Sequence, residues 1–110
     1  MSESLPLLKG TLDLLVLKAL SCEPNHGYGV SCWLEAHSRG SLGIDDSALY
    51  QALRRLEHRG FLDAEWGTSE NNRRARFYRL THKGEAELAA QSETWSRYAR
   101  SVADILGVGG

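Results

Sequence analysis

Residues 45–84 read DDSALYQALRRLEHRGFLDAEWGTSENNRRARFYRLTHKG, and this stretch decides the fold. Its first part has the spacing of an amphipathic helix, because apolar residues recur at i, i+3, i+4 and i+7. The spacing predicts a helix over residues 46–59, which Gly60 ends. Asp45 or Asp46 can cap its first turn by accepting backbone N–H bonds. The apolar residues of this helix are Leu49, Ala52, Leu53 and Leu56.

Two short runs of alternating apolar and polar residues follow, at 62–66 and 76–80. The segment between them, residues 67–75, is polar, rich in turn-forming residues and basic at its end. This pattern predicts a two-stranded hairpin with a basic tip. A helix that feeds such a ribbon is typical of a winged helix-turn-helix, a mainly α (α+β) fold that reads DNA. The hairpin side chains that we expect to pack inward are Trp66, Tyr78 and Leu80.

The charge of the chain is unevenly distributed. The net charge is −1, but residues 54–83 carry eight Lys or Arg against four Asp or Glu. The local charge of +4 leaves −5 on the other eighty residues. Because binding to phosphates responds to local potential, this asymmetry favours a nucleic-acid surface. An ordinary solvated face is the alternative on charge alone.

Two further helices are expected at residues 9–21 and 26–38, with a short strand at 41–44. The helix at 9–21 is apolar over most of its circumference. A small domain buries one face of such a helix, so the surplus surface predicts a partner, most simply a second copy of the chain.

A fourth helix is expected from its N-cap Thr81 to Leu106. Residues spaced as in a heptad repeat run along it, and a helix this long leaves its far half uncovered in a monomer. We therefore expect a homodimer, with residues 1–80 as the DNA-binding domain and 81–110 as the dimerisation helix. Ser92 adds a small residue to the helical seam. The residues expected at the interface are Leu12, Leu15, Leu88, Trp95, Ala99, Val102 and Leu106.

Several classes of protein are not expected. No apolar run reaches the roughly twenty residues of a membrane span, and no signal-peptide pattern opens the chain, so a cytoplasmic location is expected. No nucleophile elbow, phosphate-binding glycine loop or HExxH motif indicates an enzyme or a cofactor. Two thiols in a reducing compartment predict no disulfide. A zinc site is also not expected, because the candidate ligands lack a paired CxxC or HxxxH element. These candidates are Cys22, His26, Cys32 and His37.

The predicted helix over 46–59 carries a polar stripe opposite its apolar face. Gln pairs with adenine and Arg with guanine, and Ser bonds to either a base or a phosphate. A solvated helix face is the alternative. Adjacent arginines on the hairpin tip offer a second contact, since an arginine can enter a narrow minor groove. The stripe consists of Ser47, Gln51, Arg54 and His58, flanked by Tyr50 and Arg55, and the tip arginines are Arg73 and Arg74.

Trp95 has two interpretations. It lies in the middle of the heptad seam, flanked by the small residues Ser92 and Ala99. In a dimer, two such tryptophans can stack on a flat aromatic molecule. The alternative is that Trp95 simply fills the interface, as aromatic residues often do.

Four stretches resemble PadR-type transcriptional regulators. Residues 8–15 (LKGTLDLL) and 26–29 (HGYG) are similar to the start of that family. Residues 49–57 (LYQALRRLE) resemble its LYxxLxRLE signature, and residues 73–81 (RRARFYRLT), followed by Gly84, resemble its basic wing strand. The single C-terminal helix resembles the shorter of the family's two architectures.

This resemblance implies a dimeric winged-helix repressor that binds two inverted half-sites in double-stranded DNA. It also implies that the repressor leaves DNA on meeting a small aromatic effector, for which Trp95 has a similar position. The alternative function is a winged-helix protein–protein interaction module, since a fold does not settle function. The DNA-contacting residues that the resemblance implies are Lys9, Tyr50, Gln51, Arg54, Arg73 and Arg74, with Arg76 in the same wing strand.

Overall fold

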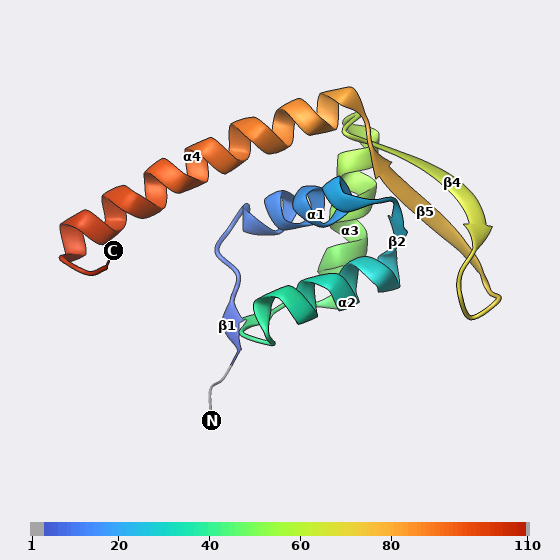
Figure 1. Ribbon diagram of the computed structural model, residues 1–110, viewed down its shortest axis with the longest axis horizontal. Coiled ribbons are helices and arrows are strands. Elements are labelled where there is room, and N and C mark those ends of the chain that lie inside the picture. The colour runs from blue at the N-terminus through green and yellow to red at the C-terminus, as the bar shows by residue number, and fades with distance from the viewer. Residues whose placement is uncertain (1–3, 110) are drawn as a thin grey trace.

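The fold is a winged helix-turn-helix with a long C-terminal helix, as the sequence predicts (Figure 1). The computed structural model describes residues 4–109. In chain order its elements are β1 (Leu5–Pro6), α1 (Thr11–Cys22), β2 (Asn25–His26), α2 (Gly27–Ser38), β3 (Leu42–Gly43), α3 (Asp46–His58), β4 (Leu62–Thr68), β5 (Arg74–Leu80) and α4 (His82–Leu106).

Side-chain caps fix where three of the helices begin. The Asp45 carboxylate accepts a hydrogen bond of 3.0 Å from a backbone N–H in the first turn of α3. Thr81 Oγ1 accepts one of 3.0 Å at the start of α4, and His26 Nδ1 accepts one of 3.0 Å at the start of α2. Each cap satisfies an N–H that has no partner within its helix. The N-cap expected at Thr81 is confirmed, and of the two candidates for α3, Asp45 and Asp46, Asp45 is the cap.

The wing is a sheet of three strands rather than two, in the order β2-β5-β4. β4 and β5 form the expected antiparallel hairpin, in which Ala64 pairs with Tyr78. On the other edge of β5, Asn25 in β2 also lies opposite Tyr78. A second, parallel pair joins β1 to β3, with Leu5 opposite Leu42. The strand expected near Leu42 is therefore present, whereas β1 and β2 were not predicted because two residues are too short to show alternation.

α1 is the central helix of the domain and packs against α2, α3, α4 and β5 (Figure 1). In its second half the apolar residues are buried, since Val16, Leu17, Ala19 and Leu20 are at most 4% exposed, whereas Lys18 remains exposed. The expectation that one chain cannot cover this helix is wrong for that half, because four elements surround it. Only the first turns of α1 keep half-exposed apolar residues, which are Leu12, Leu14 and Leu15.

α4 projects away from the rest of the domain, along the 50 Å dimension of the molecule (Figure 1). Its start is anchored at Gly84, where a Cβ atom would collide with the carbonyl oxygen of Phe61. Farther along, apolar side chains stay exposed, among them Trp95 at 39% and Ile105 at 85%. Neither α4 nor another helix within residues 4–109 combines the length and apolarity needed to cross a membrane.

Candidate nucleic-acid interface

α3 presents a polar stripe on the side away from the core. Leu49, Leu53 and Leu56 are fully buried, so the opposite face is left to solvent. Within residues 4–109, the Arg54 guanidinium on that face has no ion-pair partner. The exposure that the sequence predicts for this face is confirmed. Its exposed residues are Ser47, Tyr50, Gln51, Arg54 and His58.

Two of the arginines expected at DNA are held by ion pairs inside the domain. The Arg55 guanidinium donates to both oxygens of Asp13 on α1, with Nε 3.3 Å from Oδ2. Arg76 Nη2 on the wing donates to Glu57 Oε2 on α3 at 2.6 Å. Hydrogen bonding to these carboxylates raises the pKa of both guanidinium groups. The pairs fasten α3 to α1 and the wing to α3.

Trp66 does not pack inward as the sequence predicts, because 56% of its surface is exposed. Strand alternation puts it on the same face of the hairpin as Leu62 and Ala64. The core ends at the buried Tyr78, however, and the hairpin continues beyond it. The Arg74 guanidinium covers the indole instead, 4.6 Å from the ring centre. The sequence analysis did not predict that Trp66 is exposed, although Trp66 lies close to the basic tip of the hairpin in the sequence.

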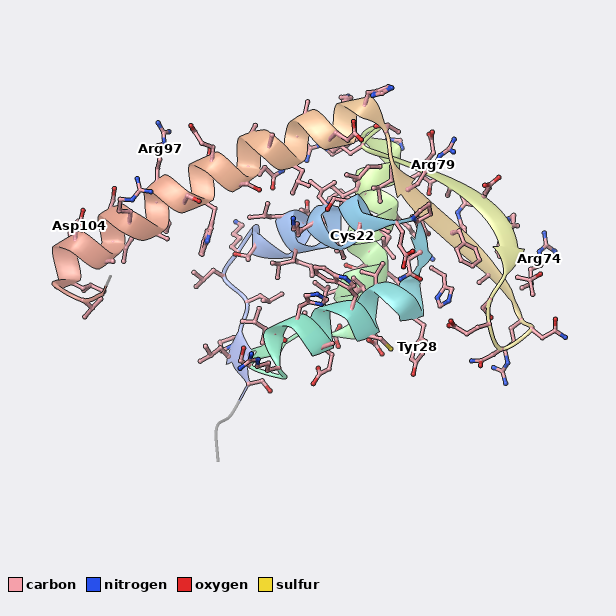
Figure 2. All side chains as sticks on the ribbon, in the orientation of Figure 1. Cys22, Tyr28, Arg74, Arg79, Arg97 and Asp104 are labelled. Atoms are coloured by element: carbon pink, nitrogen blue, oxygen red, sulfur yellow. The ribbon has the colours of Figure 1, made fainter. Side chains whose placement is uncertain are left out.

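A groove of about 910 Å³ lies between α3, the start of α2 and the wing, and we call it the α3–wing groove. Figure 2 shows two of its borders, Tyr28 at the start of α2 and Arg74 on the wing. Glu57 is the acidic side chain that lines it, and Glu57 is paired with Arg76. The groove is therefore positively charged and walled by aromatic rings. The basic and aromatic lining residues are His26, Tyr28, Tyr50, Arg54, Trp66, Arg73, Arg74, Arg76 and Tyr78.

The wing tip lies near the start of α2. The Glu70 carboxylate lies 3.8 Å from His26 Nε2, so the α2 cap also contacts the tip. Asn72 adopts a left-handed backbone conformation, with φ of 59°, which lets the chain reverse. Arg73 and Arg74 follow this turn with exposed side chains. The turn thus presents both arginines at the edge of the groove.

Cys22 and Cys32 are both free and exposed. A side-chain hydrogen bond with Cys32 raises the pKa of Tyr28 above its ordinary value. A protonated phenol can donate a hydrogen bond to a phosphate oxygen. In the part of the chain that the structure describes, no three His, Cys, Asp or Glu side chains gather to hold a metal ion.

A second pocket, of about 660 Å³, lies between the start of α1 and α4, and we call it the α1–α4 pocket. Trp95 and Tyr98 line it from α4, with their ring centres 6.2 Å apart, and Leu14 lines it from α1. Lys9 also lines this pocket and is absent from the α3–wing groove. Ser47, Gln51 and Arg55, which are also expected at DNA, likewise do not line the α3–wing groove.

The chain is similar to known proteins in both sequence and fold. The model of the family described as "Transcriptional regulator PadR-like family" matches residues 16–90. An uncharacterized protein of Lysinibacillus sphaericus is 26% identical over 90 residues, which cover 82% of this chain and 83% of that protein.

Solved structures of similar proteins share the fold. A PadR family transcriptional regulator from Eggerthella lenta is 32% identical with a TM-score of 0.76, and 92% of this chain and 86% of that chain are covered. A Streptococcus mutans protein is 27% identical with a TM-score of 0.82, and 94% and 92% of the two chains are covered. The family match spans more than half of the sequence, and the chain therefore belongs to the PadR-like family of transcriptional regulators.

Proposed function

We propose that this chain is a homodimeric repressor that binds an inverted-repeat operator in double-stranded DNA. The observation that carries the proposal is the α3–wing groove, which lies beside the exposed stripe of α3 and is edged by Arg73 and Arg74. In a winged helix, α3 enters the major groove while the wing lies over the adjacent minor groove or backbone. Such a protein works in the cytoplasm, where its operator lies.

In this proposal the contacts divide into two kinds. Gln51 and Arg54 read base edges, with Ser47 and Tyr50 beside them, whereas the wing arginines bind phosphates in any sequence. Arg55 and Arg76 lie at the same surface, but their ion pairs make them supports of α3 and the wing. The basic character of this surface favours DNA over a protein partner.

The dimer is proposed from the apolar surface of α4. In this proposal residues 1–80 form the DNA-binding domain and residues 81–110 the dimerisation helix, and the partly buried first turns of α1 also contribute to the dimer. A second copy covers exposed apolar surface that water otherwise solvates. The proposed interface comprises Leu12, Leu15, Leu88, Trp95, Ala99, Val102 and Leu106, of which Leu106 is 67% and Val102 37% exposed.

The effector is proposed from the α1–α4 pocket. Its walls include Trp95 and Tyr98, and a flat aromatic molecule can stack on such rings. Binding of this molecule would release the operator, provided that it favours a dimer geometry that does not fit DNA. The competing interpretation, in which Trp95 only fills the interface, predicts no small-molecule response.

A DNA titration tests the proposal. Fluorescence anisotropy is measured with duplexes from the regions upstream of this gene and its neighbours, and with scrambled duplexes of equal composition. We expect preference for one duplex and weaker binding as salt rises from 50 to 200 mM. Transcription in vitro from the preferred duplex should fall when the protein is added. Failure to bind any duplex at low salt would overturn the proposal in favour of the protein–protein interaction module.

A further inference from the structure

Trp66 is a large apolar side chain in an exposed place. Its indole is 56% exposed, although strand alternation directs it toward the α3–wing groove rather than the outer face of the hairpin. We propose that Trp66 is a DNA-contacting residue, whose indole packs on the sugar–phosphate backbone of one strand and holds Arg74 in place for a phosphate. This inference rests on the proposed function and assigns a role to a residue outside the predicted interface.

The place of Trp66 between α3 and the wing tip supports a backbone contact. One sugar–phosphate strand separates a major groove from the neighbouring minor groove. If α3 lies in the first and the wing tip over the second, that strand must cross the α3–wing groove. Arg54 lines this groove from α3, Arg74 lines it from β5, and Trp66 lines it from β4. The strand would therefore meet the indole.

The charges around the indole favour a phosphate. Two guanidinium groups lie over it, Arg74 at 4.6 Å and Arg76 at 5.9 Å from the ring centre. Glu57 neutralises Arg76 through a hydrogen bond of 2.6 Å. Within residues 4–109, Arg74 has no ion-pair partner. Arg74 is thus the cation on the indole that is left to neutralise a phosphate.

The stacking contact also orders Arg74. A free arginine side chain loses considerable rotamer entropy when it is fixed on a ligand, and a stacked one has lost part of that entropy already. The cation–π attraction holds the guanidinium near the groove before DNA arrives. Trp66 therefore acts in two ways, as an apolar surface for the sugars and as a positioning residue for Arg74.

Two substitutions separate the contribution of an aromatic ring at residue 66 from that of an apolar side chain without a ring. Trp66→Leu should weaken binding about tenfold, to cognate and scrambled duplexes alike, because a backbone contact carries no sequence information. Its salt dependence should become shallower by about one phosphate contact, since Arg74 is released. Trp66→Phe keeps a ring and should stay within about threefold of the original chain. The melting temperature of both variants should stay within a few degrees, because the residue is exposed.

Arg79→Ala is the matched control on the same strand. Arg79 lies on the opposite face of β5, where it is 3.7 Å from Asp63, and Figure 2 labels it together with Arg74. We expect Arg79→Ala to change DNA affinity less than Arg74→Ala does. Equal losses for the two arginines would overturn the assignment of the groove face.

A spectroscopic measurement reads the contact directly. The chain has three tryptophans, so Trp33→Phe combined with Trp95→Phe leaves the indole of Trp66 alone. Saturating DNA should protect it from acrylamide quenching. If the double variant does not fold, or loses DNA binding because Trp95 belongs to the proposed dimer interface, the unmutated chain labelled with 5-fluorotryptophan serves instead. The resonance of Trp66, assigned by comparison with Trp66→Phe, should then shift on binding DNA.

The outcomes distinguish this inference from the proposed function. If the original chain binds its operator and Trp66→Leu binds equally well, with the same salt dependence and no protection of the indole, only the inference is overturned. A lowered melting temperature that accounts for the whole loss of binding also overturns it. If the original chain binds no duplex, the proposed function and the inference fail together.

Discussion

Arg55 on α3 and Asp13 on α1 form a two-pronged ion pair between residues that are 42 positions apart in the sequence. The side chain of Asp13 is 17% exposed and that of Arg55 is 49% exposed. Thr11 and Leu14, the neighbours of Asp13 along α1, line the α1–α4 pocket. The turn of α1 that borders this pocket therefore also holds α3 in place through the ion pair.

Removing Arg55 and removing Asp13 should lower the free energy of unfolding by different amounts. Arg55→Ala leaves a mostly buried carboxylate without its partner, and we expect a loss of about 2 kcal/mol in the free energy of unfolding. Asp13→Ala leaves a guanidinium that water can reach, and we expect about 1 kcal/mol. Urea denaturation at one fixed protein concentration measures both, because dimer stability depends on concentration. Equal losses would contradict this account of the burial.

Arg54→Ala should reduce the preference for cognate over scrambled DNA by about 1–3 kcal/mol, because an arginine that pairs with guanine carries sequence information. Affinity for the scrambled duplex should change much less. Anisotropy titrations with both duplexes measure the ratio. A uniform loss on both duplexes would instead make Arg54 a phosphate contact.

The double substitution Arg73→Ala with Arg74→Ala should have the opposite signature. Binding to every duplex should weaken, and the slope of log affinity against log salt should fall by about two phosphate contacts. The measurement is a set of titrations between 50 and 300 mM salt. An unchanged slope would remove the wing tip from the interface.

Val102→Asp should disrupt the proposed dimer, because it places two like charges in a seam that the partner covers. Size-exclusion chromatography with light scattering should show a monomer at concentrations where the original chain is a dimer. Arg97→Asp is the control with the same new side chain. Arg97 lies on the outer side of α4, near Glu93, and Figure 2 shows it pointing away from α1. A dimer that survives Val102→Asp would contradict the proposed seam.

Trp95 should respond to flat aromatic molecules if the α1–α4 pocket takes an effector. In a chain with Trp33→Phe and Trp66→Phe, a binding aromatic should quench the remaining emission, and the same compound should release operator DNA. In a chain with Trp95→Ala, the same compound should no longer release operator DNA. If no compound in a varied panel quenches the emission, the interpretation of Trp95 as an interface residue alone stands.

The features that the sequence predicted correctly are local ones. The spacing of Leu49, Leu53 and Leu56 gives the buried face of α3 and, by exclusion, its exposed stripe. The caps at Asp45 and Thr81 act within one turn of their own helices. Helical periodicity and capping depend on neighbours three or four positions away, so they are legible in the sequence itself.

Tertiary structure decided which apolar side chains are buried and which arginines are paired. These features depend on what lies opposite a residue across the fold. The burial of Leu17 and Leu20 depends on four elements that surround α1. The exposure of Trp66 depends on where the core ends beneath the hairpin. The ion pair of Arg55 depends on the position of Asp13, which is 42 residues away in the sequence and lies on another helix. The sequence alone thus determined the helices, the hairpin and the exposed polar face of α3. Only long-range packing determined which arginines are paired, and that a tryptophan lies in the groove with a cation stacked on it.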